Sequence, residues 1–282
     1  MSAAALYPFT LNFSSARSAA FFPFMFDGKE ADAGGTLPAP SCVISAREAG
    51  DMRFNPAAEN PARERFFSSL GMDPAKVYSL SQVHSLDVFA VDAAASPAAF
   101  TREGDGMVCG NDSVFLAVTV ADCLPVFLLD TESGAFAALH SGWRGTGIVN
   151  RALALMAARY RTRALAVAAV LGPCIQGCCY RVDEARFRAF GAEFGAARRG
   201  EEDSGPAAVR RGGAYFLDMR AANIRLLAAA GVRNIAYCKD CTFEDGRLGS
   251  YRREGAENYT RMVSAAGYFG PAAMRVSSMP PL

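Results

Sequence analysis

The chain has 282 residues, 51% of them hydrophobic and 20% charged, and its 29 lysines and arginines nearly balance 28 acidic residues, which leaves a formal charge of +1. This composition predicts one large folded core and excludes a disordered or fibrous protein. Because the net charge is so small, no global field favours nucleic acid or a membrane surface, and a small molecule is the expected partner.

The first half of the chain reads as short strands separated by polar turns. Residues 1–50 are irregular in composition, with possible strands near 9–13 and 41–45. A helical pattern covers 60–70, and β-branched or apolar runs then predict strands at 77–80, 88–91, 106–109, 114–120, 125–129 and 135–139. The last of these strands is expected to lead into a glycine-rich loop, HSGWRGTG, at 140–147.

Strands and helices alternate in the second half. A helix after the loop has one apolar face, made of Val149, Ala152, Leu153, Met156 and Tyr160. Further elements are expected as a strand at 164–171, a helix at 183–194, strands at 215–217 and 235–238, and a helix that Asp218 caps and Gly231 ends. The polar segment 195–213 reads as a surface insertion. The alternation predicts a single α/β domain over 1–282 whose sheets are covered by helices.

The N-terminus, MSAAALYPFTLNFSSAR, has no basic residue ahead of an apolar stretch, and no run approaches the roughly 18 apolar residues of a membrane span. We therefore expect a cytoplasmic protein. Its eight cysteines are then expected to be reduced thiols rather than a disulfide framework, which serves small secreted domains.

Three side chains suggest metal chemistry. The chain has only two histidines, His84 and His140, and both lie in short polar segments beside predicted strands, as does Cys123 between them. Imidazole and thiolate are ligands that zinc prefers, and three protein ligands with one open position are typical of a catalytic zinc site. The same residues also allow a plainer interpretation, in which the histidines satisfy core hydrogen bonds and Cys123 is a buried apolar side chain.

Several ordered motifs resemble one known family. They are SQVHSLD at 81–87, GDGMVCG at 104–110, VADCLPV at 120–126, HSGWRG at 140–145, LGPCIQGCCYRV at 171–182, DMRAAN at 218–223, DCT at 240–242 and GSYRREG at 249–255. Together they resemble the YfiH-type purine nucleoside phosphorylase family, which is also labelled laccase domain, polyphenol oxidase and peptidoglycan editing factor. The resemblance covers residues 60–261. It implies a layered sandwich of mixed sheets with flanking helices, a fold shared with cytotoxic necrotizing factor toxins.

The resemblance implies that His84, Cys123 and His140 are the metal ligands, with zinc as the ion and copper as an alternative. Asp122, beside the cysteine, is a candidate proton shuttle or a residue that fixes a ligand, although it equally suits a turn between two strands. The family has an arginine-bearing STR motif near its N-terminus, and the corresponding residues here are SSAR, which makes Arg17 a weak candidate for binding substrate or phosphate.

The activities implied are phosphorolysis of purine nucleosides (adenosine, guanosine, inosine and methylthioadenosine) and deamination of adenosine at one shared site. Zinc at an open site can activate water for deamination, whereas phosphorolysis needs a cationic cradle for phosphate. Candidates for that cradle are Arg144, Ser250, Arg252 and Arg253. Trp143, the only tryptophan, could stack on a purine or anchor its loop.

Other functions remain open at this point. Two imidazoles are too few for the four ions of a multicopper oxidase, so a polyphenol oxidase could only use a single copper and is the least favoured alternative. A metal-free hydrolase could use Cys123 as nucleophile and a histidine as base. The third alternative is an enzyme that edits peptidoglycan precursors. Preferred substrate and oligomeric state, with a homodimer one option, are not fixed by the sequence.

The remaining cysteines raise the question of a second site. Cys238 and Cys241 form a C-x-x-C pair. Together with Cys174, Cys178 or Cys179 they could hold a structural zinc ion or form a redox pair.

Overall fold

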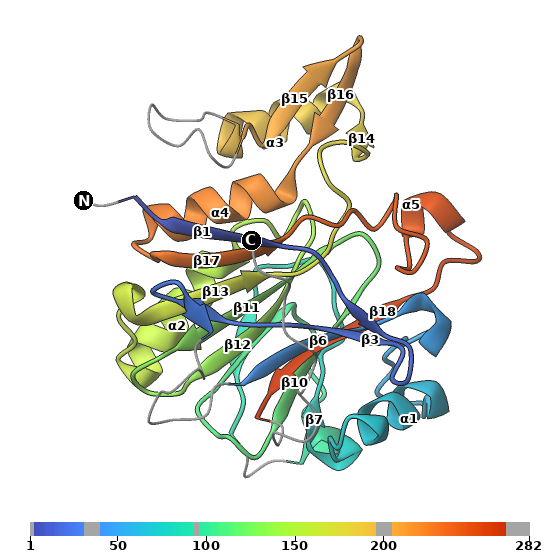
Figure 1. The fold of residues 1–282 in the computed structure, drawn as a ribbon, viewed down its shortest axis with the longest axis vertical. Coiled ribbons are helices and arrows are strands. Elements are labelled where there is room, and N and C mark those ends of the chain that lie inside the picture. The colour runs from blue at the N-terminus through green and yellow to red at the C-terminus, as the bar shows by residue number, and fades with distance from the viewer. Residues whose placement is uncertain (1–2, 31–39, 93–95, 196–204, 269–282) are drawn as a thin grey trace.

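A seven-stranded sheet and a six-stranded sheet pack face to face in the computed structural model, which describes residues 3–30, 40–92, 96–195 and 205–268 (Figure 1). The first sheet has the order β1 (Ala5–Phe9), β17 (Asn234–Cys238), β13 (Val167–Leu171), β11 (Leu124–Asp130), β12 (Phe136–Ser141), β9 (Gly106–Cys109) and β8 (Val88–Ala90). The second has the order β2 (Phe13–Ser14), β3 (Ala19–Phe22), β6 (Ser41–Ser45), β18 (Met262–Gly267), β10 (Phe115–Val120) and β7 (Val77–Tyr78). Both sheets are mixed. In the first, β1 runs parallel to β17 and β11 antiparallel to β12, and in the second, β10 runs parallel to β7 and antiparallel to β18.

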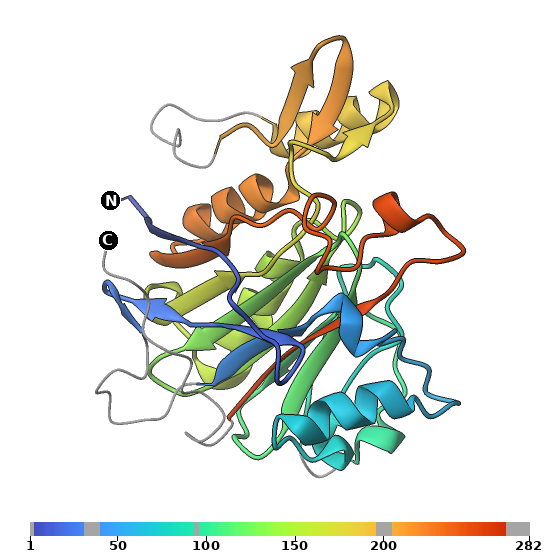
Figure 2. The ribbon, with the colours of Figure 1, turned by 45° about the vertical axis from the view of Figure 1, so that its right-hand side comes forward.

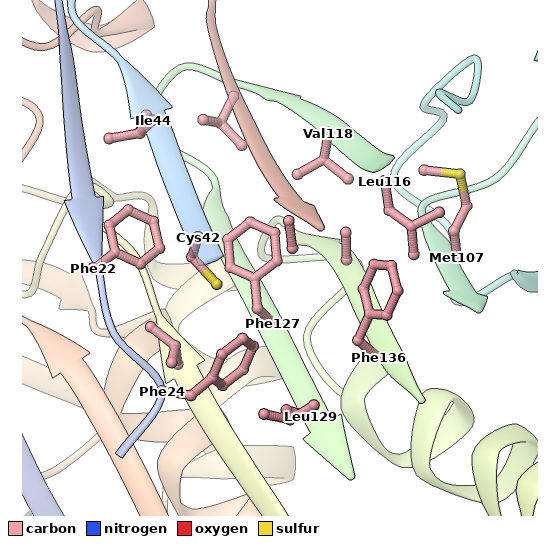
Figure 3. Close-up of a cluster of buried hydrophobic side chains, with 14 of the residues drawn as sticks. Phe22, Phe24, Cys42, Ile44, Met107, Leu116, Val118, Phe127, Leu129 and Phe136 are labelled. Carbon is pink, nitrogen blue, oxygen red and sulfur yellow. The ribbon is translucent and has the colours of Figure 1, made fainter. Parts of the chain in front are cut away.

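The main core lies between the two sheets (Figure 3). Phe127 and Phe136 from the first sheet meet Phe22, Ile44 and Leu116 from the second, and all five are almost completely buried. Burial of one such side chain is worth about 1.5–3 kcal/mol, so this interface fixes the two sheets against each other.

Helices cover the outer faces of both sheets. The seven-stranded sheet is covered by α2 (Ile148–Tyr160) and α4 (Met219–Ala229), which supply Val149, Met156 and Leu227 to a second apolar cluster. The six-stranded sheet is covered by α1 (Pro61–Ser69), whose Phe66 and Phe67 are buried in a third. The two sheets therefore form the inner layers of the molecule, and helices form the outer ones.

A smaller unit projects beyond α4 (Figure 2). It contains α3 (Glu184–Phe194) and a three-stranded sheet in the order β14 (Arg181–Val182), β16 (Ala214–Leu217) and β15 (Ala208–Arg211). The other elements are the hairpin of β4 (Met25–Phe26) and β5 (Lys29–Glu30), the short helix α5 (Tyr251–Glu254), and 3₁₀ turns at Arg47–Ala49, Pro74–Lys76, Pro97–Ala99 and Ala164–Ala166. No helix in the described ranges is long and apolar enough to cross a membrane.

The predicted mixed α/β sandwich with flanking helices is confirmed, whereas some local predictions were wrong and one strand was missed. Residues 9–13 are not one strand, because β1 ends at Phe9 and β2 begins at Phe13. His140 lies in β12 rather than in a loop, since its pairing with Pro125 extends the ladder with β11. The insertion 195–213 contains β15, and its residues 196–204 lie outside the described part of the chain. No strand was predicted at β18, which is buried along its whole length and so shows no alternating pattern.

Candidate active site

The two histidines and Cys123 converge at one edge of the sheets. His84 lies between β7 and β8, Cys123 in the turn between β10 and β11, and His140 near the end of β12. The Cys123 Sγ atom is 3.9 Å from His84 Nε2, and the two imidazole centroids are 4.9 Å apart. One donor atom from each residue lies within 4.8 Å of the others. Because His140 is buried and His84 exposed, the group is reached from the solvent side.

Asp105, at the start of β9, holds this arrangement together. Its carboxylate is fully buried and accepts a 2.7 Å hydrogen bond from Nδ1 of His140. It also accepts bonds from the backbone N–H groups of Val83, His84 and Ser85, at 3.2, 3.1 and 2.6 Å. Because Nδ1 of His140 binds Asp105, its Nε2 atom can face Cys123 or bind a metal ion. Histidines that bind metal ions commonly donate their other ring N–H to a carboxylate in this way.

The site backbone is constrained at three positions. His84 and Asp122 have left-handed conformations, with φ of 60° and 79°. A side chain at Gly142 would place a Cβ atom 2.9 Å from His84 Cδ2 and 3.1 Å from Cys123 Sγ. The glycine therefore gives the imidazole and the sulfur room to approach each other.

Cys123 and His140 form a charge-coupled pair. Burial opposes the thiolate, but the charge of His140 and hydrogen bonds from both imidazoles outweigh it and lower the pKa of Cys123 to about 6. Burial likewise opposes the imidazolium, while Cys123 and Asp105 outweigh it and raise the pKa of His140 to about 9. Burial also disfavours the charged form of Asp105, yet its hydrogen bond to His140 keeps the pKa of the carboxyl below its usual value. Without a metal ion these shifts favour a thiolate on Cys123 and an imidazolium on His140 at neutral pH.

The trio opens into a cavity of about 470 Å³, a size suited to a small molecule. The lining includes four arginines, Arg53, Arg186, Arg252 and Arg261. It also includes five aromatic side chains, Phe54, Trp143, Tyr180, Tyr251 and Tyr259. Among the described residues Asp122 is the one carboxylate in this lining, and Asp51, outside the lining, pairs with Arg53 at 3.8 Å and with Arg261 at 3.3 Å. The cavity therefore suits a polar ligand that has a flat part.

Asp122 and Arg252, both predicted from the sequence, line the cavity. One carboxylate oxygen of Asp122 accepts a 2.6 Å bond from Thr242 Oγ1, and the other accepts a 2.7 Å bond from the backbone N–H of Arg252. The guanidinium of Arg252 lies 5.0 Å from the ring centre of Tyr180 and donates to the carbonyl of Arg181 at 2.9 Å. Asp122 therefore ties the cysteine-bearing turn to the first turn of α5.

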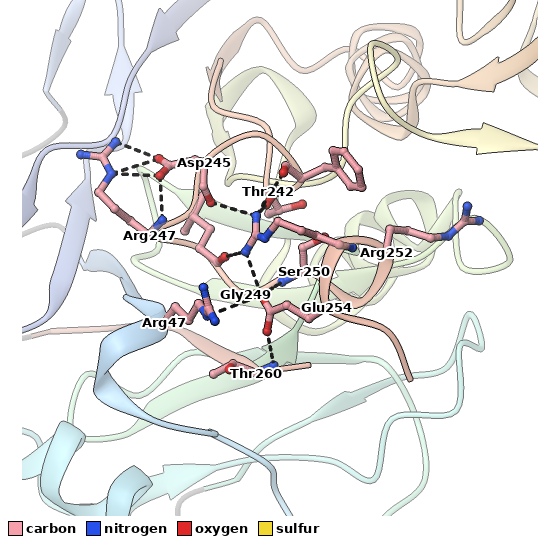
Figure 4. A network of polar contacts seen from close by, with 12 residues as sticks. Arg47, Thr242, Asp245, Arg247, Gly249, Ser250, Arg252, Glu254 and Thr260 are labelled. Atoms are coloured by element: carbon pink, nitrogen blue, oxygen red, sulfur yellow. Dashed lines mark hydrogen bonds and ion pairs between the residues drawn. The ribbon is translucent and has the colours of Figure 1, made fainter. Parts of the chain in front are cut away.

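The other predicted cradle residues lie outside the cavity lining. Ser250 is buried and caps α5 by accepting the backbone N–H of Arg253, as in the polar network of Figure 4. The Arg253 guanidinium donates to backbone carbonyls of the same loop, including that of Phe243 at 3.1 Å. Arg144 is exposed, with its guanidinium 5.3 Å from the ring centre of Trp143. Arg17 lies in the turn between β2 and β3, where its N–H donates to the carbonyl of Ser14.

Sequence reasoning missed several site residues. The structure adds Asp105 and three arginines, Arg53, Arg186 and Arg261. The signal for Asp105 was present, because it is the acidic residue of GDGMVCG at 104–110, a motif whose glycines allow close packing. The arginines carried no local signal.

The fold and site define a mixed α/β protein with an open His, Cys, His donor set in an arginine-lined cavity. A family described as "Multi-copper polyphenol oxidoreductase laccase" matches residues 47–268, and this chain belongs to that family. The resemblance drawn from the motifs is thereby confirmed.

Three similar proteins support the family assignment and the fold. A protein of Corynebacterium glutamicum named purine nucleoside phosphorylase is 34% identical over 79% of this chain and 87% of its own length. The crystal structure of YlmD from Geobacillus stearothermophilus matches with a TM-score of 0.74 at 23% identity, covering 91% of this chain and 98% of that one. The hypothetical protein YfiH of Bacillus licheniformis matches with a TM-score of 0.70 at 23% identity, covering 81% and 92%. The two structures are similar in fold.

Proposed function

We propose that this protein is a zinc-dependent purine nucleoside phosphorylase that also deaminates adenosine. The observation that carries the proposal is the open His84, Cys123 and His140 trio at the wall of an arginine-lined cavity. Adenosine, guanosine, inosine and methylthioadenosine are the substrates proposed. The name of the Corynebacterium glutamicum relative agrees with this class of activity.

The donor set fits zinc. Three donor atoms already lie within 4.8 Å of one another, and Asp105 fixes the tautomer of His140 that presents Nε2. When bound, a zinc ion supplies a Lewis acid that activates water for attack on the purine ring. A single copper ion is the alternative occupant, because two imidazoles and a thiolate also suit copper.

Side chains of the cavity would then bind the phosphate and the purine base. Arginines present a planar fork that matches a phosphate, and Arg252 is the one that the backbone contact to Asp122 places at the cavity wall. Each oxygen of Asp122 keeps a second lone pair, so this carboxylate can also take a proton from the substrate. Trp143 and Tyr180 also line the cavity, but Arg186 lies 4.7 Å from the ring centre of Trp143 and Arg252 lies 5.0 Å from that of Tyr180, so a purine would have to share these rings with arginines.

The test separates the two reactions and the metal. Purified protein is analysed for zinc and copper and then assayed with each nucleoside, with and without phosphate, for free base and for ammonia. Arg252→Ala is expected to raise KM for phosphate, while Arg188→Ala on the exposed face of α3 serves as the matched control. Muropeptides are assayed alongside to detect peptidoglycan editing. Absence of nucleoside turnover in a fully metal-loaded sample removes the proposal.

A second candidate function follows from the Cys123, His140 and Asp105 chain. A thiolate next to an imidazolium that a carboxylate orients is the arrangement of a cysteine hydrolase. Chelation and alkylation distinguish the two functions. Activity on an acyl substrate that survives zinc removal and is lost when iodoacetamide modifies Cys123 supports the hydrolase. Nucleoside turnover that is lost on chelation and restored by zinc supports the first proposal.

A further inference from the structure

A group of sulfur atoms gathers at a second place, about the turn that follows β13. The group, called the cysteine cluster below, consists of Cys178, Cys179, Cys241 and Glu244. One donor atom from each lies within 4.8 Å of the other three. This differs from the sequence-based grouping, because Cys238 lies apart, with its thiol 3.4 Å from Asp240 Oδ2, and Cys174 is buried in the second apolar cluster.

We propose that the cysteine cluster is a second metal site, one that binds a divalent ion of the zinc class through four protein ligands. The ligand set of three thiols and one carboxylate is soft enough to select zinc over magnesium or calcium. Four protein donors leave no open coordination position. The site is therefore structural, unlike the three-donor site around His140.

The distances suit a tetrahedral ion after a small contraction. With zinc–sulfur bonds of about 2.3 Å, neighbouring ligand atoms in a tetrahedron stand about 3.8 Å apart. The donors thus need to move by about 1 Å or less from their present separations. Cys179 now donates its thiol hydrogen to Glu244 Oε1 at 3.5 Å, a contact that an ion bound to both atoms would replace. Cys178 and Glu244 are exposed, which gives the ion a path from solvent.

Backbone contacts hold the two loops together independently of any ion. Cys174 and Cys241 form a parallel β-bridge, and the N–H of Thr242 donates to the carbonyl of Cys174 at 3.1 Å. The N–H of Gln176 points at the sulfur of Cys241 at 3.5 Å. The Arg211 guanidinium fixes the carbonyl of Cys178 at 2.8 Å. Because these contacts position the thiols in advance, less ordering entropy opposes metal binding.

An ion in the cluster would join two loops that form the cavity wall. Tyr180, next to Cys179, lines the cavity, and Thr242, next to Cys241, binds the carboxylate of Asp122. The second ion is therefore expected to stabilise the wall without touching the substrate. The inference does not depend on the proposed reaction.

The experiment removes the first site and asks whether zinc still binds. The background variant is Cys123→Ser/His84→Ala, kept reduced, loaded with Zn²⁺ and freed of excess ion by gel filtration. Wild type is expected to retain about two zinc ions per chain and the background variant about one. Adding Cys178→Ser/Cys179→Ser to the background should abolish the remaining zinc. Circular dichroism checks that each variant is folded.

Two further measurements test the ligands themselves. Cobalt added to the background variant should give strong near-ultraviolet absorption from thiolate ligation, which the added double cysteine change removes. Glu244→Gln should weaken zinc binding by about 10-fold or more, whereas Glu257→Gln on the exposed loop after α5 should not. Zinc absent from the folded, reduced background variant, or retained equally without Cys178 and Cys179, overturns the proposal.

Discussion

Replacement of Asp105 by asparagine tests the arrangement of the active site most directly. One oxygen of the Asp105 carboxylate accepts bonds from the N–H of His84 and from Nδ1 of His140. The other accepts three, from the N–H of Val83 and from the N–H and hydroxyl of Ser85. Asparagine replaces one of these oxygens by an NH₂ group, which cannot accept any of the bonds.

Either orientation of the amide is costly. If the NH₂ group takes the place of the second oxygen, two backbone donors lose their acceptor, at about 1–3 kcal/mol each or about 2–6 kcal/mol together. If it takes the place of the first oxygen, His140 must accept at Nδ1. Its proton then moves to Nε2, the nitrogen needed for ligation. Zinc affinity is therefore expected to fall by about 10- to 100-fold.

Zinc affinity is measured by competition with a chelator, and the free energy of unfolding by denaturant titration of the metal-free protein. Ser85→Ala is the matched control, because it keeps the carboxylate and removes one hydroxyl, at a cost of about 1 kcal/mol. If Asp105→Asn binds zinc as tightly as the wild type and also unfolds with the same free energy, the role argued for this carboxylate is refuted, because each orientation of the amide must lower one of the two quantities.

Three further predictions address the same cavity. Arg252→Ala should raise KM for phosphate more than Arg144→Ala does, because Arg252 lines the cavity, whereas Arg144 lies outside the lining against the ring of Trp143. Equal effects on KM in steady-state assays would contradict this placement. In metal-free protein, iodoacetamide should modify Cys123 rapidly at neutral pH, because the thiolate is the reactive form. The rate should fall to half as the pH drops to about 6. A midpoint of about 8.5, the pKa of an ordinary thiol, would argue against the charge pair. Gly142→Ala should weaken zinc binding, because the added Cβ would lie 2.9 Å from the His84 ring. Circular dichroism should show an unchanged fold. Unchanged zinc affinity in the chelator assay would show that the loop shifts to make room for the methyl group.

Patterns within short segments carried most of the successful sequence predictions. The strand at Gly106–Cys109 was predicted with its observed bounds, and the cap at Asp218 was found because an N-cap is a local hydrogen bond. The grouping of His84, Cys123 and His140 depended on something more, the resemblance of their motifs to a family. Spacing alone could not bring together three segments from different strands.

Contacts between distant segments set the limit of sequence reasoning. Strand β1 pairs with β17, more than 220 residues further along the chain, and nothing near Ala5 indicates that partner. The cavity arginines are similar, because Arg53, Arg186 and Arg261 come from distant parts of the sequence and line one cavity only in the folded chain. An arginine in a loop has the same sequence appearance whether it faces solvent or substrate.

The metal-site and thiolate chemistries exclude each other within one molecule. A bound ion takes the thiolate of Cys123 and needs His140 neutral at Nε2, whereas the charge pair requires that same nitrogen to carry a proton. Asp105 supports both states, since its bond to Nδ1 orients the ring in either one. Zinc loading should therefore protect Cys123 from alkylation in proportion to occupancy and release protons as it proceeds. Measured in one preparation, nucleoside turnover that follows zinc occupancy, and falls as the alkylated fraction rises, assigns the activity to the metal form.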